Sequence, residues 1–398
     1  MAEAVIVSAV RTPIGRANKG VLKDVRADDL GAVAVRGALE RVPRLDRALI
    51  EDVLIGCAFP EGEQGMNVAR LIGALAGIPE TAGGVTVNRF CASSLQAVNM
   101  AAQNIMLGMG EVFVAGGIES MSRVPMGGFN PSFNPRLIKP REGEQPSSSY
   151  PPSELEYGYS SYIPMGMTAE NLAREYHISR EAQDAFALRS HRRALAAIDS
   201  GTFKREIIPV PLPDGRVMDT DEGPRRDTSL ERLASLEPAF IKGGTVTAGN
   251  SSPLNDGAAA VVLMSAEKAR EQGITPLARV ITMAVSGVNP AVMGIGPVPA
   301  VKKALQRAGM QLSDIDIIEL NEAFAAQSLA VIQALGLDEE RVNPHGGAIA
   351  LGHPQGCSGA RLVATLLNAL QTADKTLGIA TLCIGGGQGL ATIIERIA

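Results

Sequence analysis

The sequence predicts an α/β protein built on mostly parallel, covered sheets, and three observations support this fold class. Short apolar runs with the length of buried strands alternate with amphipathic stretches of helical period. This alternation fills about the first 120 residues and is repeated over about the last 125. The chain has 398 residues, of which 45% are hydrophobic and 20% charged, so it can form two or three domain-sized cores.

The expected elements follow one order in both halves. Strands are expected in the first half at residues 4–10, 51–59 and 111–120, and helices at 27–41, 67–77 and 94–109. Strands are expected in the second half at 277–287, 315–324 and 377–387, and helices at 299–309 and 360–371. Segment 38–56 resembles 304–320 in pattern, and 110–120 resembles 377–387, so we predict a duplication.

A segment of different character, residues 121–250, separates the halves. Residues 125–164 contain eight prolines and a serine cluster, which is typical of a solvated linker. All five tyrosines nevertheless fall within 150–176, and tyrosine combines an apolar ring with a polar tip that suits a lid or pocket wall. Long irregular segments of compact proteins are often functional, so an ordered insertion covering a site is favoured over a free linker.

Composition excludes several classes of protein. A net charge of −5 without a basic run argues against nucleic-acid binding, and no apolar run reaches the roughly 18 residues of a membrane span. Neither end shows a targeting signal, so a soluble cytoplasmic protein is expected. The cysteines and histidines show neither CxxC pairs nor zinc-binding spacing, so no metal site is predicted: Cys57, Cys91, Cys357, Cys383, His177, His191, His345 and His353.

Cys91 is the candidate nucleophile. A strand-like run at 84–90 stops at this cysteine, and small residues followed by a helical pattern come next. This order places the thiol at a strand-to-helix turn near a helix N-terminus. Unpaired N–H groups and the helix dipole stabilise a thiolate there, so we predict a lowered pKa for Cys91.

His353 is the candidate base. It precedes Pro354 in a glycine-rich stretch, 343–361, and histidine is the usual base for a nucleophile. A histidine satisfied within a turn is the alternative, but the prolyl and glycyl surroundings restrict the backbone and favour a function. His345, eight residues earlier, is assigned no role.

Two further residues stand where apolar strands are expected to end. Cys383 is followed by Gly385, Gly386 and Gly387, which let backbone N–H groups converge on an oxyanion, although a buried cysteine can also be a plain core residue. The spacing is not GxGxxG, which excludes a dinucleotide fingerprint. Asn321 can orient a water or an oxyanion at the end of its strand, or simply cap a helix.

Taken together and in this order, the motifs closely resemble the thiolase family. They are RTPIGR, VNRFCASSLQAV, GGIESMS, MGMTAEN, GGTVTAGNSSPLNDGAAA, GIGPVPA, NEAFAAQ, GGAIALGHP and CIGGGQG. The resemblance implies the thiolase fold, in which two duplicated βαβαβαββ halves form five αβαβα layers with an inserted loop domain. It implies an N-terminal half at 1–120 plus about 251–273, an insertion at 121–250 that binds coenzyme A, and a C-terminal half at 274–398.

The resemblance also implies the catalytic roles. Cys91 would carry the acyl group as a thioester, and His353 would activate it and help bind the thioester oxygen. Cys383 would be the second acid/base, and Asn321 would hold a water that completes one oxyanion hole with His353. The backbone N–H groups of Cys91 and Gly385 would form the other hole. Coenzyme A is a co-substrate, and neither a permanently bound cofactor nor a metal is implied.

Positions near the coenzyme follow from the same resemblance. Ser252 matches a position near the pantetheine, and Arg225 matches one near the nucleotide, a role that Arg226 could share. A solvated surface is the alternative for both arginines. Met165 and Phe324 are expected to wall the acyl pocket. Homodimers or homotetramers are expected, as in the family.

The activity implied is that of an acyltransferase, the 3-ketoacyl-CoA thiolase of fatty acid β-oxidation. Pro164 stands where acetoacetyl-CoA thiolases usually have a histidine, which favours broad-chain thiolysis over acetoacetyl-CoA synthesis. A ketoacyl synthase would use Cys-His-His, and a non-catalytic acyl-CoA-binding relative would lack Cys91 or Cys383. Gln355, Ala92 and Ser94 depart from the family pattern beside catalytic groups, which leaves rate and chain-length preference open.

Overall fold

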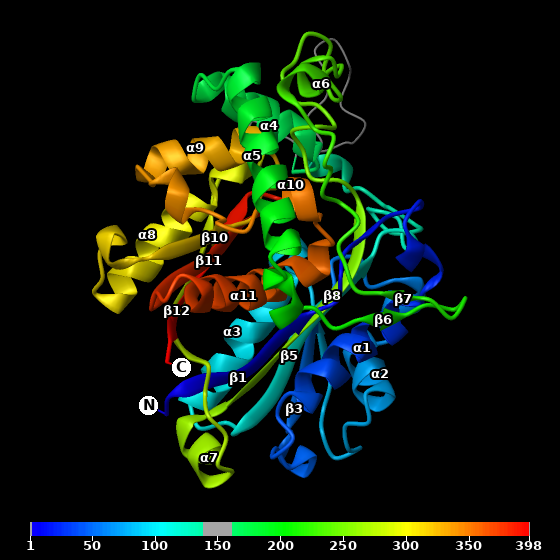
Figure 1. Ribbon diagram of the computed structural model, residues 1–398, viewed down its shortest axis with the longest axis vertical. Helices are drawn as coiled ribbons and strands as arrows, with labels where there is room; N and C mark the ends of the chain where they lie inside the picture. Colours follow the sequence, from blue (N-terminus) through cyan, green and yellow to red (C-terminus); the bar gives the residue numbers. More distant parts are fainter. Residues whose placement is uncertain (1, 138–160, 398) are drawn as a thin grey trace.

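The computed structural model describes residues 2–137 and 161–397 (Figure 1). The first half contains β1 (Ala4–Arg11), β2 (Gly15–Arg16), α1 (Ala27–Glu40), β3 (Asp52–Gly56), α2 (Val68–Leu75), β4 (Val85–Val87), α3 (Ser93–Met106) and β5 (Val112–Ser120). Next come α4 (Met165–Glu175), α5 (Arg180–Asp199), β6 (Val210–Pro211), β7 (Val217–Met218) and α6 (Leu230–Ala234). The remainder contains β8 (Asn255–Ser265), α7 (Ala266–Glu271), β9 (Ala278–Gly287), α8 (Pro297–Ala308), β10 (Ile317–Leu320), α9 (Ala325–Leu335), α10 (Ala348–Leu351), α11 (Gln355–Thr372), β11 (Leu377–Ile384) and β12 (Gln388–Arg396).

The strand order repeats on the two sides of a central junction. In the described part of the chain, the main path is β10-β11-β12-β9-β1-β8-β5-β3-β4, and β2 pairs with β8. The halves meet where β1 pairs with β9 through only Val5–Arg279 and Ile6–Ala278. Moving outward from that junction, β1-β8-β5-β3 corresponds to β9-β12-β11-β10. This correspondence agrees with the duplication predicted from the two sequence halves.

The prediction of mostly parallel sheets is wrong, because each half is mixed. β3 is parallel to β4 and β5, and β10 is parallel to β11. β8 is antiparallel to β1 and β5, and β12 is antiparallel to β11 and β9. β12 follows β11 after residues 385–387 alone. A connection this short permits only antiparallel pairing, since a parallel neighbour needs a long crossover.

Three apolar cores separate five layers (Figure 1). The first core lies between α1 and α2 and one face of the first-half strands. The second contains side chains of α3 and α11 and the facing sides of both sets of strands. The third lies between the second-half strands and α8 and α9. α3 and α11 therefore form a central helical layer, and each begins two residues after a candidate catalytic residue, α3 after Cys91 and α11 after His353.

The described part of the insertion is ordered and packed. α4 and α5 bury Leu172, Ala173, Phe186 and Ala187, and in Figure 1 they stand over the end of the sheet near α10. Residues 138–160 lie outside the described ranges. The expectation that tyrosines of this stretch line a lid therefore concerns residues that the structure does not describe, apart from Tyr162 and Tyr176.

A buried ion cluster joins the insertion to the first half. Arg11 at the end of β1 is fully buried, and its Nε contacts Glu206 at 2.6 Å. Its two terminal nitrogens contact the oxygens of Asp221 at 2.7 and 2.9 Å. Glu206 also accepts hydrogen bonds from Thr365 and Asn368 of α11. The cluster therefore links three regions of the chain that are far apart in sequence.

Replacing Arg11 with methionine is expected to reduce the free energy of unfolding by about 3–5 kcal/mol, because two buried carboxylates lose their counter-charge. Chemical denaturation followed by circular dichroism measures this loss. Arg216→Met is the control, because Arg216 pairs with Asp214 at the surface and exposed pairs contribute little. Equal losses in the two variants would contradict the prediction.

Candidate active site

Cys91 lies on a strained turn between β4 and α3. Phe90 adopts φ = +45°, a left-handed conformation that is rare for a bulky aromatic residue. Asn88 Oδ1 accepts from the Phe90 N–H at 2.9 Å. Ser93 Oγ accepts from the Arg89 N–H at 2.9 Å and donates to the Phe90 carbonyl at 2.6 Å. These bonds fix the backbone of Arg89 and Phe90 immediately before Cys91, and strain of this kind is often found at functional sites.

The thiol of Cys91 contradicts the predicted lowering of its pKa. Burial raises the pKa of Cys91 to about 11, although the backbone N–H groups of Gly385 and Cys91 itself act to lower it. Only 7% of the residue is exposed, so the cost of burying a charge exceeds the gain from those N–H groups. The cysteine is therefore a neutral thiol at rest and would have to transfer its proton to a base before acting as a nucleophile.

His353 is held as a neutral imidazole with one identifiable tautomer. Ser358 Oγ donates to the Pro354 carbonyl at 2.8 Å, so it must accept at its 2.6 Å contact with His353 Nδ1. Nδ1 therefore carries the hydrogen, and Nε2 presents a lone pair to Asn321 Nδ2 at 3.3 Å. Burial, assisted by Arg361, lowers the pKa of His353 to about 3. His353 can accordingly accept a proton through Nε2.

Cys383 lies close to Cys91 in a dry environment. It is fully buried near the end of β11, within an apolar cluster that also contains Phe324 and Val246. Burial raises the pKa of Cys383 far above that of a free thiol, and the nearby Cys91 raises it further. The two thiols therefore disfavour simultaneous ionisation.

Met165 and Phe324, the two residues expected to wall the acyl pocket, pack in the same apolar cluster as Cys383. Phe324 packs in the cluster that contains Cys383, and its ring meets that of Phe240 edge-on with centroids 6.0 Å apart. Met165, the first residue of α4, packs against this cluster. A side chain added at Gly385 would contact Met165 Sδ at 3.6 Å and Phe90 at 3.8 Å. The Gly385 backbone is thus bordered by apolar side chains from two distant segments.

A separate polar groove of about 340 Å³ lies along the insertion. Its lining includes Arg16, His191, Arg225, Arg232 and Ser251. Its wall thus carries three arginine side chains, which suits a phosphate-bearing ligand.

The two remaining residues predicted for coenzyme binding lie differently from Arg225. The Arg226 guanidinium is exposed and pairs with Asp199, away from this lining. The backbone N–H of Ser252 donates to the Ala323 carbonyl at 3.0 Å, and the neighbouring residues Ser251 and Pro253 line the groove instead. The structure therefore brings Arg225 to the groove but not Arg226 or the Ser252 side chain.

His191 gives the groove a pH-dependent contribution to stability. Burial, with Arg225 and Arg16 nearby, lowers its pKa from 6.5 to about 4, while Asp227 acts in the opposite direction. Between these values the unfolded chain binds a proton that the folded chain does not. The free energy of unfolding therefore falls as the pH decreases through this window.

His191→Asn is expected to reduce the loss of unfolding free energy between pH 7.5 and 4.5 by about 2–3 kcal/mol. An asparagine oxygen can still accept from the Arg225 N–H, which now donates to His191 Nδ1 at 3.2 Å. Denaturant titrations of both proteins at the two pH values measure the difference. The same pH-dependent loss in both would show that His191 is not the group responsible.

Ser94, Ala92 and Gln355, which depart from the family pattern, all lie in or beside the central helices α3 and α11. Ser94 Oγ accepts from the Ala360 N–H at 2.9 Å, which joins α3 to α11. Ala92 is fully buried directly after Cys91. Gln355 Nε2 lies 3.7 Å from Met126 Sδ, at the start of α11. The serine therefore stabilises the contact between the two central helices.

Among the described residues, the structure shows neither a metal-binding group nor a membrane-spanning helix. No group of three or more His, Cys, Asp or Glu side chains in ranges 2–137 and 161–397 is placed to hold a metal ion. Across those same ranges, no helix combines the length and apolar character needed to cross a membrane.

Family models match almost the whole chain. Residues 4–267 match the thiolase N-terminal domain, and residues 274–396 match the thiolase C-terminal domain. The chain belongs to the thiolase family. This thiolase is 49% identical to the 3-ketoacyl-CoA thiolase of Bacillus subtilis (strain 168), covering 99% of this chain and 100% of the relative. It is 50% identical to the 3-ketoacyl-CoA thiolase of Shewanella frigidimarina (strain NCIMB 400), with full coverage of both chains.

Solved structures agree with this assignment. The acetyl-CoA acetyltransferase of Bacillus anthracis superposes with a TM-score of 0.88 at 42% identity, covering 100% of this chain and 99% of that one. Human mitochondrial 3-ketoacyl-CoA thiolase superposes with the same TM-score at 40% identity and the same coverage. A complex of that human enzyme with CoA also superposes at 0.88 and 40% identity, covering 100% of this chain and 98% of that one. The thiolase fold is thereby confirmed.

Sequence reasoning missed two groups that organise the site of this thiolase. Ser358 fixes the tautomer of His353, and its position five residues downstream in the same motif was the available signal. Glu119, in the GGIES motif, is fully buried and accepts from the backbone N–H groups of Ala58 and Gly356 at 2.8 Å. Glu119 therefore ties the start of α11 to the loop after β3.

Proposed function

We propose that this thiolase uses coenzyme A to cleave 3-ketoacyl-CoA into acetyl-CoA and a shortened acyl-CoA, as a step of fatty acid β-oxidation. The observation that carries the proposal is the grouping around Cys91. Its sulfur interacts with the N–H of Gly385 and lies near Cys383, and α11, which His353 precedes, packs against the turn of Cys91. The curated relatives named 3-ketoacyl-CoA thiolase supply the substrate class.

The first half-reaction transfers an acyl group to Cys91. The neutral His353 takes the thiol proton through Nε2, and the thiolate adds to the 3-keto carbon. Donors at the oxyanion hole stabilise the tetrahedral intermediate. The Cα–Cβ bond then breaks, the electron pair becomes the enolate of acetyl-CoA, and the Cys383 thiol protonates its carbon.

The second half-reaction releases the shortened chain. The thiol of coenzyme A gives its proton to the Cys383 thiolate and attacks the Cys91 thioester, which yields acyl-CoA. Protonated His353 returns its proton to the departing Cys91 thiolate, so the free enzyme is restored. In the reverse direction, the same groups catalyse a Claisen condensation. Acetoacetyl-CoA synthesis is the alternative function, because a similar solved structure is named acetyl-CoA acetyltransferase.

Thiolysis kinetics on 3-ketoacyl-CoAs of about four to sixteen carbons test the function, followed by loss of substrate enolate absorbance. Higher kcat/KM on medium and long chains supports β-oxidation and agrees with Pro164 preceding Met165 at the start of α4. Activity confined to acetoacetyl-CoA would instead establish an acetyltransferase. An absence of thiolysis at every length would overturn both functions.

We propose that coenzyme A binds in the groove lined by Arg225, and this assignment gives a paired prediction. Arg225→Ala is expected to raise the KM for coenzyme A about tenfold with little change in kcat, because a phosphate contact far from the reacting sulfur contributes to binding alone. Arg226→Ala is the matched control, since its guanidinium already pairs with Asp199. Steady-state kinetics with varied coenzyme A measure both. A larger rise in the KM for coenzyme A in Arg226→Ala than in Arg225→Ala would assign the phosphate contact to Arg226 instead.

We also propose a cytoplasmic homodimer or homotetramer. β4 ends the strand order, and the nearby segment around α2 exposes apolar side chains at Met66, Leu71 and Leu75. An exposed strand edge beside apolar surface favours association with another chain. Light scattering coupled to size-exclusion chromatography measures the mass, and a monomer would contradict this proposal. The division into halves at 1–120 with 251–273 and 274–398, around the 121–250 insertion, is likewise proposed.

A further inference from the structure

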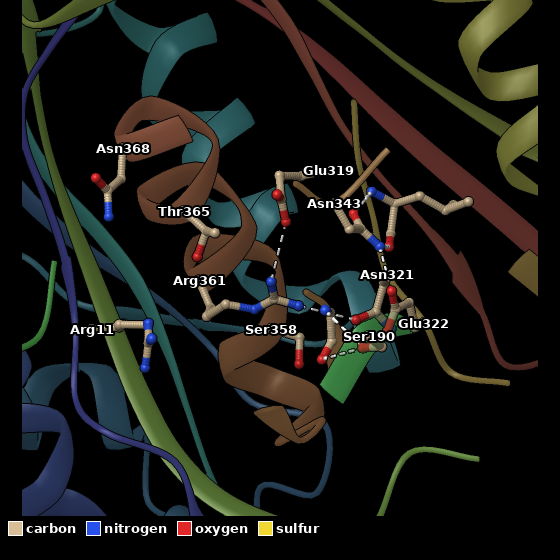
Figure 2. A network of polar contacts seen from close by, with 12 residues as sticks. Arg11, Ser190, Glu319, Asn321, Glu322, Asn343, Ser358, Arg361, Thr365 and Asn368 are labelled. Carbon is tan, nitrogen blue, oxygen red and sulfur yellow. Dashed lines mark hydrogen bonds and ion pairs between the residues drawn. The ribbon is translucent and has the colours of Figure 1, made fainter. Parts of the chain in front are cut away.

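A second buried ion pair, Arg361 with Glu319, adjoins Asn321 (Figure 2), the residue that contacts His353. Glu319 is on β10, Asn321 follows that strand, and Arg361 comes from the middle of α11. All three side chains are buried, with Glu319 and Asn321 at 0% exposure and Arg361 at 1%. The pair therefore belongs to the interior between the central helix and the second-half strands.

The contacts form a chain that leads to His353. Arg361 Nη1 lies 3.3 Å from Glu319 Oε2, and Arg361 Nη2 donates to Asn321 Oδ1 at 3.5 Å (Figure 2). Asn321 Nδ2 in turn faces His353 Nε2 at 3.3 Å. Arg361 thus contacts one end of the amide whose other end contacts the catalytic imidazole.

The direction of the Asn321 amide matters because its two ends are chemically opposite. Nε2 of His353 is an acceptor in the tautomer set by Ser358, so it requires the NH₂ end of the amide. A flipped amide would place two acceptors against each other and remove the donor. A guanidinium has donors and no acceptor, so Arg361 admits only the orientation with Oδ1 toward it.

Stability alone does not account for this ion pair. Glu319 Oε1 and Arg361 Nε are buried without a hydrogen-bond partner among the described residues. Arg11, by contrast, contacts carboxylates through Nε and both terminal nitrogens. A buried pair with unsatisfied atoms contributes little or negatively to stability, so its presence beside the site favours a functional role.

The neighbouring charges support the same role. Burial raises the pKa of Glu319, and the Arg361 charge is the largest influence that opposes this rise, so the guanidinium favours the charged carboxylate that holds it. Glu322 does not compete for Arg361 contacts, since it accepts from Ser190 at 2.6 Å and from Asn343 at 2.9 Å. The Arg361 charge also helps to keep His353 neutral, which its role as a base requires.

We propose that Arg361, held by Glu319, is a positioning residue that sets the orientation of the Asn321 amide and so keeps its N–H groups directed at His353 and the reaction centre. This inference rests on the proposed function, because the step it supports is acyl transfer to Cys91. Arg361 acts through Asn321 and touches neither the substrate nor the reacting sulfur.

The test is a double-mutant cycle between Arg361 and Asn321, with acetyl transfer from acetyl-CoA to Cys91 and full thiolysis as readouts. Arg361→Lys and Glu319→Gln keep the volume and are each expected to lower kcat about tenfold, with the KM for coenzyme A unchanged. Asn321→Ala is expected to lose about 10²–10³ in rate as a missing oxyanion donor. Adding Arg361→Lys to Asn321→Ala is expected to cost no further rate.

Thr365→Val is the control, because Thr365 lies one turn further along α11 and donates to Glu206 at 3.0 Å instead. It is expected to lower the melting temperature without lowering kcat. Losses that multiply in the double variant, or an unchanged kcat in Arg361→Lys and Glu319→Gln, would overturn the inference. A wild-type chain that neither forms acetyl-enzyme nor cleaves 3-ketoacyl-CoA would instead overturn the proposed function, and with it the step that Arg361 is said to support.

Discussion

Replacing Cys91 with serine is expected to lower thiolysis by at least about 10⁴-fold while leaving the fold unchanged. An alcohol is a much weaker nucleophile than a thiol at neutral pH, and a neutral histidine cannot ionise it to a comparable degree. The turn itself does not depend on sulfur, because Asn88 and Ser93 hold the backbone around Phe90. The variant therefore isolates the chemistry of the side chain.

Mass spectrometry of the intact protein after incubation with acetyl-CoA measures the acetyl-enzyme directly. Wild-type protein is expected to gain one acetyl group and Cys91→Ser none. Cys357→Ser is the matched control, because Cys357 is another buried free cysteine, on α11. It is expected to retain acetylation. A Cys91→Ser protein that keeps most of its activity would remove Cys91 from the role of nucleophile.

The raised pKa of Cys91 shows what local sequence could not predict. A strand-to-helix turn was predicted correctly, and the helix α3 does begin at Ser93. The sign of the pKa shift was wrong because it depends on how completely the thiol is buried. That burial comes from segments far away in sequence, because Cys91 lies in an apolar core with residues of α11 and β11. A dipole acting within one helix is local, whereas desolvation depends on the tertiary structure.

Hydrophobic periodicity predicted most of the helices and strands, but it did not predict how the strands pair with one another. The helix expected at 299–309 is α8, and it ends at Gly309 with φ = +65°, as a left-handed C-terminal cap requires. The strands β8 and β12 were not predicted, and the prediction of mostly parallel pairing was wrong because an apolar run does not indicate the direction of the neighbouring strand. The coenzyme-binding roles of Ser252 and Arg226 stay predictions, since motif position does not determine where a loop side chain points.

Replacing Cys383 with alanine is expected to reduce exchange of the acetyl-CoA methyl protons with solvent by about 10²–10⁴-fold, because the variant lacks the acid/base group. Acetylation of Cys91 by acetyl-CoA is expected to continue in part, since that step breaks no carbon–carbon bond. Proton NMR in deuterium oxide measures exchange, and mass spectrometry measures acetylation of the same sample. Unchanged exchange would exclude Cys383 from the mechanism.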